Sequence, residues 1–528
     1  MNERAWSSCF LVSLALVGCA ISRTPLDPID ASNDGYDAGS SDSGRADSGM
    51  ISSDSGTSQN DAGGTFDPRD CATPATILEV ATAESGADGL TVAADTAGNL
   101  YVGGAFSDRL TVRTATTLDA TGANRRDGFL VSLTASGAVR WARVFGDALD
   151  GDHTVSAALV VGDLVIVSGT FDRELDLHVP GTSGDLPPLV TSSWPMSTGF
   201  VAALRVSDGA PVFAQVYDGK LAAAGASEIL AAGGQYPGCG ATTGDVQIAR
   251  LDVAALMTDP VTGARSPTCR RAVGFSGATI SRVTIATGGD VLVAGASAAD
   301  TFGTESIVRP AASTGSMPAG LVARLSPDLA VRWARGYRTL PHPVHPHPSH
   351  VHVTEVRERD GTLIIAGRVL GAADLGNGPL IGFTSGSDWD LVIASLDAAT
   401  GETQWSEIFA NEGVDSLAGI EVDRASQMHV AGRFTGPALD LSGGVAPLAG
   451  QGQLFAATFG ETGAHQCSRA STGGPGSTNA SSTATSPDGH EWFVTGTAVG
   501  SLDFGSGAIG DASSSRLRVY VQRFSLVQ

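Results

Sequence analysis

A short apolar strand that ends in glycine recurs along the chain, and this recurrence restricts the possible folds more than any other feature. The strands include LYVGG, VIVSG, VLVAG and LIIAG. Their closing glycines are Gly104, Gly169, Gly233, Gly295, Gly367, Gly432 and Gly496. Successive glycines are 65, 64, 62, 72, 65 and 64 residues apart, so seven copies of one unit follow each other. A fixed period indicates a repeat architecture, in which each unit buries its apolar faces against its neighbours.

Each copy contains alternating apolar segments for one four-stranded antiparallel sheet. The clearest copy is residues 88–146, where LYVGGAF ends near Phe106 and the segments FLVSL and VRWARVF are joined by a turn at Thr134–Gly137. The last segment of a copy carries a bulky residue after a turn: Trp141, Phe213, Trp333 and Trp405. In copies three and six, Cys269 and Cys467 occupy roughly this place. We therefore expect an all-β domain.

The sheets are expected to form a seven-bladed β-propeller of four-stranded blades over residues 71–528. Sheets stacked radially bury their faces and leave only short protected edges. The seventh copy ends at Gln528 soon after its third strand, whereas the strand-like segment Thr76–Ala83 precedes the first copy. We predict that this N-terminal segment supplies the outer strand of the last blade and closes the ring.

Residues 1–19 have the pattern of a lipoprotein signal peptide. The apolar run Phe10–Val17 is too short to span a bilayer, and it leads into LVGC, which ends at Cys19. This tetrapeptide resembles the bacterial lipobox, which implies that Cys19 is lipidated and anchors the exported protein at the outer membrane or cell surface. The alternative is an ordinary cleaved signal. Residues 20–70 are rich in Asp, Ser and Gly, and they predict a disordered tether with a reach of roughly 40 Å.

The repeat resembles a known bacterial family. The units TVAADTAGNLYVGGAF and DGFLVSLTASGAVRWARVFG are similar to the β-propeller repeat called the SBBP repeat. The resemblance extends from about residue 86 to residue 528 and is weak in copies three and seven. Proteins of this kind are mostly secreted or attached to the surface and mostly lack an assigned activity. The resemblance therefore implies a fold and a location, and it leaves the ligand open.

Composition and motifs favour a binding or scaffold module over an enzyme. The chain has 55 acidic and 32 basic residues, and its formal charge of -23 disfavours nucleic acid as a partner. It contains no GxSxG, HExxH or P-loop motif. We expect no catalytic residue and no cofactor. The expected partners are a membrane, through the lipid, and a protein or carbohydrate ligand.

Two enzyme alternatives remain open. The segment Leu396–Trp405, LDAATGETQW, resembles the tryptophan-docking motif of quinoproteins that hold pyrroloquinoline quinone. A hydrolase is the second alternative, because aspartates cluster at Asp147, Asp150 and Asp152 and again at Asp388 and Asp390. Such groups hold calcium or act as an acid and a base. Turns between strands also favour Asp, and this interpretation requires no site.

A histidine-rich segment is the most unusual local feature. The sequence PHPVHPHPSHVHV contains His342, His345, His347, His350 and His352 and coincides with the one lengthened spacing. Dense neutral imidazoles bind zinc or copper, so a metal site is one hypothesis. A solvated connector between two sheets is the other, because the prolines extend the segment and leave the histidines spread along it.

Two further features suggest contacts or cross-links. The long loop 179–197 carries Trp194, a candidate contact for a partner or sugar, although such a ring often covers its own loop. The exported domain has four cysteines, which allow three disulfide connectivities. We favour Cys239 with Cys269, which belong to one copy, and Cys71 with Cys467, which lie near the expected closure.

Overall fold

The computed structural model describes residues 72–526, except 114–115, 122–124, 148–150, 178–185, 192–196, 241, 259–265, 310–318, 338, 342–348, 383–387, 443–446, 451–452 and 474–477. The chain divides into two units, residues 1–64 and 65–528. The first unit lies outside the described residues, and so do the predicted lipidation site Cys19 and the predicted tether.

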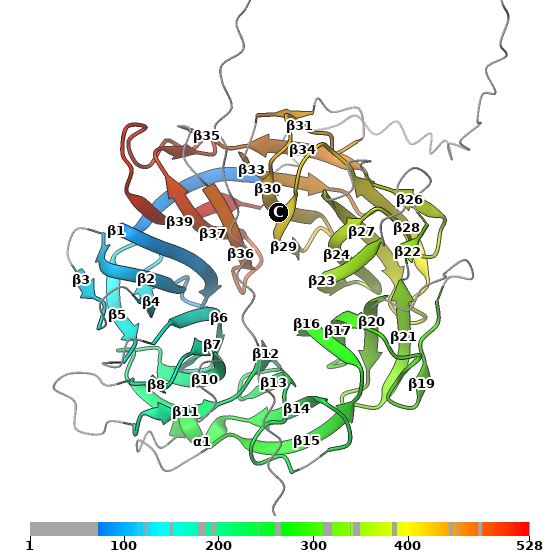
Figure 1. Ribbon diagram of the computed structural model, residues 1–528, viewed down its shortest axis with the longest axis horizontal. Helices are drawn as coiled ribbons and strands as arrows, with labels where there is room; N and C mark the ends of the chain where they lie inside the picture. Colours follow the sequence, from blue (N-terminus) through cyan, green and yellow to red (C-terminus); the bar gives the residue numbers. More distant parts are fainter. Residues whose placement is uncertain are drawn as a thin grey trace, which may run out of the picture. The chain divides into compact units, whose positions relative to one another are not determined.

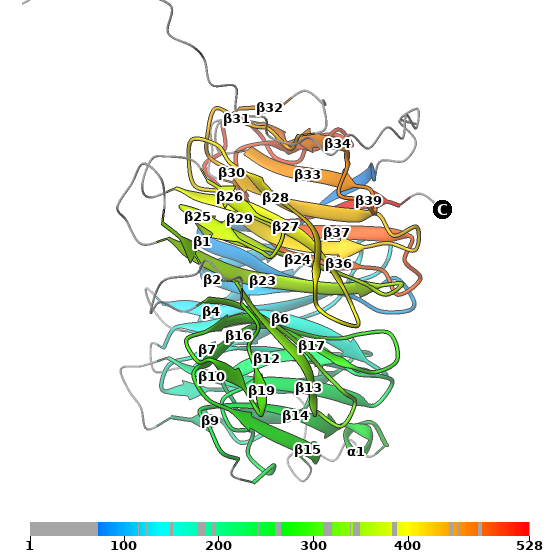
Figure 2. The ribbon, with the colours of Figure 1, turned by 90° about the vertical axis from the view of Figure 1, so that its right-hand side faces the viewer.

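Antiparallel sheets are arranged around a central axis, as Figure 1 shows. Five are separate four-stranded sheets, and a larger sheet joins the two ends of the described chain. Viewed from the side, the strands run across the thickness of the ring (Figure 2). The fold is a β-propeller.

Each sheet has an innermost strand near the axis (Figure 1). The innermost strands are β1 (Thr73–Ala94), β6 (His153–Val161), β12 (Gly219–Ala223), β16 (Ala278–Ile285), β23 (His350–Arg359), β29 (Ser416–Val422) and β36 (Thr478–Thr485). The second strands are β2 (Leu100–Val112), β7 (Leu164–Phe171), β13 (Glu228–Gly233), β17 (Val291–Ser297), β24 (Thr362–Leu370), β30 (Met428–Phe434) and β37 (Glu491–Val499). Consecutive innermost strands contact one another, and β36 contacts β1, so they form a closed ring.

Two more positions complete each sheet. The third strands are β4 (Arg126–Leu133), β10 (Thr198–Arg205), β14 (Val246–Asp252), β20 (Ala319–Leu325), β27 (Trp389–Asp397), β33 (Gln453–Phe459) and β39 (Leu517–Ser525). The outer strands are β5 (Val139–Phe145), β11 (Pro211–Val216), β15 (Thr268–Phe275), β21 (Val331–Tyr337), β28 (Thr403–Phe409) and β34 (His465–Ala470).

Strand β1 joins the two ends of the described chain. Its first half pairs with β39, from Thr73 opposite Ser525 to Ala83 opposite Leu517. Its second half pairs with β2, and residues 81–83 pair with both neighbours. The predicted pairing of segment 76–83 with the last strand is therefore present. However, this segment is continuous with the first strand of copy one, whereas the sequence suggested two separate pieces.

Short accessory strands are present in addition to the strands above, and the sequence did not predict them. They are β3 (Thr116–Asp119), β8 (Glu174–Leu175), β9 (Leu189–Val190), β18 (Thr301–Phe302), β19 (Glu305–Ser306), β22 (Thr339–Leu340), β25 (Ala372–Asp374), β26 (Pro379–Ile381), β31 (Ala438–Leu439), β32 (Leu448–Ala449), β35 (Thr472–Gly473) and β38 (Leu502–Asp503). The short helix α1 (Ala254–Thr258) follows β14. Among the described residues, no helix combines the length and the hydrophobicity needed to cross a bilayer.

The apolar core lies between neighbouring sheets. Each buried cluster combines side chains from two consecutive sheets; for example, Phe145 of β5 stacks on Phe200 of β10 with ring centroids 5.9 Å apart. Burying one such aromatic side chain contributes roughly 1.5–3 kcal/mol. The repeat period therefore produces a series of equivalent interfaces, each of which needs both neighbours.

Tryptophans of the outer strands connect neighbouring sheets. Trp333 donates its Nε1–H to the carbonyl of Ala398, 3.1 Å away in the next sheet, and its ring packs on Gly401. Gly401 has a φ of +71°, and an added Cβ would lie 2.7 Å from the indole. Trp141 makes the same contacts with Val206 and Gly209. The turn in LDAATGETQW therefore receives the tryptophan of the preceding sheet.

Candidate ligand site at the axis

The innermost strands enclose a cavity of about 420 Å³ at the axis. Every innermost strand contributes to its wall, from Leu90–Ala94 of β1 to Ser481–Thr485 of β36. This volume lies within the range of small-molecule sites. The cavity is therefore the candidate site that the closed ring itself creates.

A recurrent β-bulge determines which side chains face this cavity. Six innermost strands shift register against their second strands at equivalent points, for example between Ile280 and Arg282 in β16 and between Val353 and Glu355 in β23. Only β12 pairs without such a shift among the described innermost strands. A bulge bends the strand and re-aims its side chains. The same device therefore places Arg282 and Glu355 at the axis.

The closing glycines of the repeat accommodate these bulges. A Cβ on Gly104 would lie 1.8 Å from the carbonyl oxygen of Asp88, and one on Gly295 would lie 1.9 Å from that of Thr279. The innermost strand thus presses its backbone against the glycine of the second strand. This close approach explains why glycine recurs at this position.

The cavity has two chemically different walls. Strands β1, β6 and β12 supply mostly small or aliphatic residues, in the segments Leu90–Ala94, Ser156–Val160 and Leu221–Ala223. Strands β16, β23, β29 and β36 supply charged and hydroxyl side chains. One side of the cavity is therefore suited to apolar contact and the other to polar recognition.

Four charged residues form a continuous network on the polar wall. Arg357 bonds both oxygens of Glu421, with Nη2–Oε1 3.0 Å and Nε–Oε2 3.2 Å, and its Nη1 lies 2.9 Å from Oε2 of Glu355. The same Glu355 oxygen lies 3.2 Å from Nε of Arg282. Thr483 donates to Oε1 of Glu421 at 3.2 Å. The network thus links four consecutive innermost strands.

The network fixes the charges of its inner members. Burial disfavours the carboxylate of Glu421, but Arg357 outweighs this effect and lowers the pKa of Glu421. Burial also disfavours the guanidinium of Arg357, yet Glu421 and Glu355 hold its pKa above the ordinary value. Glu421 therefore stays ionised, and it is unsuited to act as a general acid.

The sequence did not single out these four residues, although it contained a signal. Charged residues interrupt innermost strands that are otherwise small or apolar, as in SRVTI, TEVRER and AGIEV. In copy one the equivalent segment reads LTVAA. Alignment of the copies identifies these charged positions, whereas the closing glycines mark only the second strands.

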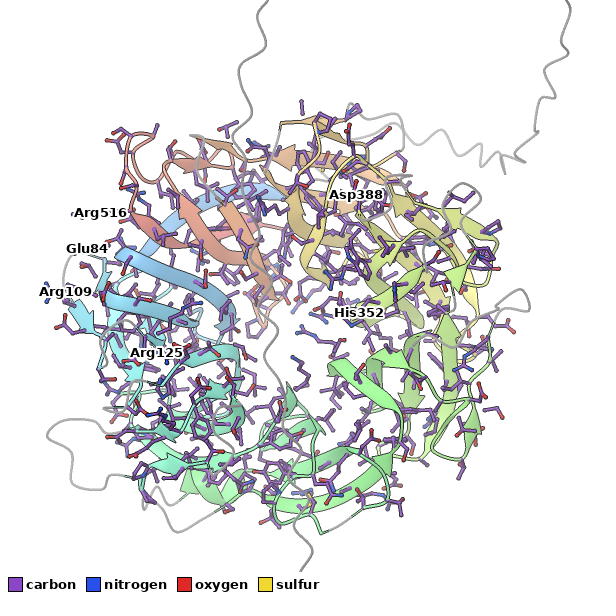
Figure 3. All side chains as sticks on the ribbon, in the orientation of Figure 1. Glu84, Arg109, Arg125, His352, Asp388 and Arg516 are labelled. Carbon is purple, nitrogen blue, oxygen red and sulfur yellow. A yellow bond between two sulfur atoms is a disulfide. The ribbon has the colours of Figure 1, made fainter. Side chains whose placement is uncertain are left out.

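Only part of the predicted metal-binding segment is described. His342, His345 and His347 lie outside the described residues. His350 and His352 lie on β23, and Figure 3 shows His352 beside the central opening. Nε2 of His352 lies 3.2 Å from Ser281 Oγ, and burial, followed by the charge of Arg368, lowers its pKa. No group of three or more His, Cys, Asp or Glu side chains in the described part of the chain is placed to hold a metal ion.

The predicted aspartates of the first cluster belong to a junction between two sheets. Asp152 accepts a hydrogen bond from the Arg126 backbone, and Asp150 lies outside the described residues. Asp147 lies beside the fully buried His153, whose Nδ1 is 3.3 Å from Asp127 Oδ1. Burial opposes protonation of His153, but its hydrogen bonds to Asp127 and to the Glu174 carbonyl raise its pKa. His153 stands apart from the histidine-rich segment, so its position in the sequence does not by itself indicate a site.

The second aspartate cluster occupies the equivalent junction four sheets later. The strand pairing aligns Asp390 with Asp127, Asn411 with Asp147 and Asp415 with His153. Asn411 donates from Nδ2 to Oδ2 of Asp415 at 2.9 Å and from its backbone to Asp390 at 3.2 Å. Burial, reinforced by Asp390 and Asp388, raises the pKa of Asp415 to about 7. In Figure 3, Asp388 lies farther from the axis than His352. These aspartates are not part of the axial cavity.

The remaining predicted residues are partly described. Cys239 and Cys269 form a disulfide with an S–S distance of 2.00 Å, which ties β15 to the segment after β13. Cys467 is also disulfide-bonded, while Cys71 lies outside the described residues. Trp194 lies outside the described residues as well.

No known protein family and no curated protein matches the sequence. Among solved structures, the chain is similar to BamB from Moraxella catarrhalis, with 14% identity, a TM-score of 0.36, and coverage of 85% of this chain and 99% of that one. It is also similar to quinohemoprotein alcohol dehydrogenase from Comamonas testosteroni, with 11% identity, a TM-score of 0.37, and coverage of 86% and 76%. A Dyadobacter fermentans protein of unknown function has 9% identity, a TM-score of 0.35, and coverage of 85% and 99%. Because these TM-scores are low, the similarities support no conclusion about function. The description of the fold is based on the strand pairing.

Proposed function

We propose that this protein is an exported, lipid-anchored binding module whose ligand site is the axial cavity. The observation that carries the proposal is the convergence of Arg282, Glu355, Arg357 and Glu421 on one wall of that cavity. Charged groups in a partly desolvated site cost free energy unless they are paired, and these four residues are paired with one another. Their pairing leaves the cavity open for a ligand. A preformed polar wall opposite an apolar wall suits ligand recognition.

The proposal includes the finer architecture. Dividing the large sheet at β1 gives two further four-stranded units, and with the five separate sheets this supports seven blades. Cys19 is proposed to carry the lipid at the outer membrane, and residues 20–70 to act as the tether. The LVGC tetrapeptide after an apolar run and the polar composition of residues 20–70 support these two assignments.

Binding is favoured over catalysis by the state of the cavity carboxylates. A carboxylate-dependent hydrolase needs one protonated carboxyl group beside an ionised one. Arg357 engages both Glu421 and Glu355, and it lowers the pKa of Glu421. Asp415, whose pKa is raised to about 7, lies in a junction between sheets. The described carboxylates of the cavity therefore suit electrostatic recognition better than proton transfer.

A variant that fills the cavity tests the proposal. Ala223 is exposed and lines the cavity, so Ala223→Trp is expected to occupy it without displacing core residues. Thermal denaturation should be followed with a panel of neutral sugars, sugar acids, sugar phosphates and amino acids. A ligand that binds only the folded state adds about 2.7 kcal/mol to the free energy of unfolding when its concentration is 100 times its Kd. This added stability raises Tm.

We expect at least one compound to raise the Tm of the wild-type protein but not that of Ala223→Trp. The matched control is Val190→Trp, because Val190 is 67% exposed on an accessory strand, and this variant should respond like the wild type. The proposal fails if no compound raises Tm, or if compounds raise the Tm of Ala223→Trp equally.

A further inference from the structure

Arg282 differs from the other charged residues of the cavity because its donors are largely uncommitted. Its side chain is 38% exposed, whereas those of Glu355, Arg357 and Glu421 are 13%, 14% and 10% exposed. Its ion pair joins Nε to Glu355 at 3.2 Å. Among the described residues, its Nη1 and Nη2 groups have no hydrogen-bond acceptor.

The carboxylate oxygens of the network are also shared unevenly between Arg282 and Arg357. Both oxygens of Glu421 are bonded by Arg357, and the oxygen of Glu355 that faces Arg282 also binds Arg357. Two guanidinium groups therefore share one carboxylate oxygen at this end of the network. The charges of the two arginines and two glutamates sum to zero, but an arginine side chain stays protonated in proteins, so the uncommitted donors of Arg282 present positive charge to the cavity.

Hydroxyl groups also line the cavity. Ser482 follows the bulge of β36, as Arg282 follows that of β16, so the two occupy equivalent levels of the ring. Ser156 and Thr485 also line the cavity, and Ser156 is exposed. Hydroxyls both donate and accept hydrogen bonds, so they suit a ligand with hydroxyl groups of its own.

We propose that the axial cavity binds a small anionic polyol, with its carboxylate or phosphate on Arg282 and its hydroxyls on the serine and threonine side chains. This inference rests on the proposed binding function and specifies its ligand class. The guanidinium fork matches either anion with two parallel hydrogen bonds. A cavity of about 420 Å³ has room for one sugar-sized molecule. The apolar wall would cover the face of such a ligand that carries no hydroxyl.

Calorimetric titration of the full-length chain near neutral pH tests this inference. The probes are D-glucuronate, glucose 6-phosphate, glucose and inorganic phosphate. We expect at least one of the two anionic sugars to bind, and to bind at least about tenfold more tightly than both glucose and inorganic phosphate, or about 1.4 kcal/mol. Glucuronate and glucose 6-phosphate distinguish a carboxylate from a phosphate as the preferred anion.

Variants of Arg282 link the binding to this residue. Arg282→Gln is expected to weaken binding of the anionic sugar at least about tenfold, whereas Arg282→Lys should retain part of it, because the charge remains. Arg109→Gln is the matched control, since Arg109 is 58% exposed and pairs with Asp119 away from the cavity. The melting temperature of each variant shows whether it has folded.

The inference is overturned if glucose or inorganic phosphate binds as tightly as the anionic sugar, if neither anionic sugar binds, or if folded Arg282→Gln binds like the wild type. These failures are distinct from failure of the binding function. Neutral ligands could raise the Tm of the wild type and of Arg282→Gln equally, but not the Tm of Ala223→Trp. This result would support the binding function and reject an anionic ligand.

Discussion

The carbonyl oxygen of Thr279 lies 1.9 Å from the point that a Cβ on Gly295 would occupy. Gly295→Ala must therefore displace the backbone of β16, close to Arg282. We expect the free energy of unfolding to fall by about 3 kcal/mol, because the added methyl group overlaps a backbone atom and no side chain can rotate to relieve the overlap. Chemical denaturation measures this loss. Gly86→Ala is the control, since its Cβ would mainly meet the Ser107 hydroxyl at 3.1 Å, and it should change stability by no more than about 0.5 kcal/mol. Equal losses in both variants would contradict the explanation.

Trp333 and Gly401 should behave as a coupled pair across two sheets. Trp333→Ala removes the ring and its hydrogen bond to Ala398, and we expect it to cost about 3–5 kcal/mol. Trp333→Phe should cost less, because a ring remains. Gly401→Ala introduces a methyl group 2.7 Å from the indole, at a φ of +71°. In a double-mutant cycle the combined variant should lose less stability than the two single losses together, since removing the ring makes room for the methyl. Simple additivity would count against direct docking.

Asp415 should make the protein less stable as the pH rises toward neutrality. Its folded pKa, about 7, exceeds the ordinary value of 3.8, so the folded state retains a proton that the unfolded state releases. The stabilisation is complete below pH 3.8 and is lost as the pH rises through 7, by no more than about 4 kcal/mol. Asp415→Asn mimics the protonated form, so its stability should exceed that of the wild type by more at pH 8 than at pH 5.

A surface aspartate supplies a contrast of opposite sign. The Ser486 hydroxyl and the His490 backbone lower the pKa of Asp488, so ionised Asp488 stabilises the folded protein above pH 3.8. Asp488→Asn should therefore be slightly less stable than the wild type at pH 8. If Asp415→Asn and Asp488→Asn shift stability in the same direction at pH 8, the buried-proton explanation is wrong.

The repeated elements could be predicted from a single copy of the repeat, whereas the axial site could not. The closing glycines and the pair FLVSL and VRWARVF identified the strands, because apolar alternation and turn residues are local properties. The bulge before Arg282 depends on how β16 meets Gly295, which is a contact between strands. Likewise, His153 becomes significant only when the fold brings it to Asp127. Sites formed between copies are therefore invisible to a reading of one copy at a time.

Cys19 is predicted to be the membrane attachment point. Cys19→Ser removes the thiol that receives the lipid and should move the protein from the membrane fraction to the soluble or secreted fraction. Metabolic labelling with a radioactive fatty acid should label the wild type but not Cys19→Ser. Cys9→Ser is the control, since Cys9 lies within the signal segment before the LVGC tetrapeptide. Unchanged membrane attachment of Cys19→Ser would reject the anchor.

A zinc or copper site in the histidine-rich segment is one hypothesis, and a solvated connector is the other. Joint replacement of His342, His345 and His347 by alanine should abolish binding of either metal in calorimetric titration, because too few imidazoles remain to complete a site. His490→Ala is the control, as His490 lies outside the histidine-rich segment. If the triple variant binds metal as well as the wild type does, the segment is only a connector.

Strand β1 pairs with β39 along its first half and with β2 along its second half. Residue 72 leads directly into this strand, so any force transmitted through residues 1–71 would act on the element that holds the ring closed. The first residues of β1 that would receive such a pull pair only with β39, whereas residues 81–83 pair with both neighbours. The strand that completes the propeller is therefore also its mechanical link to whatever the N-terminus is attached to.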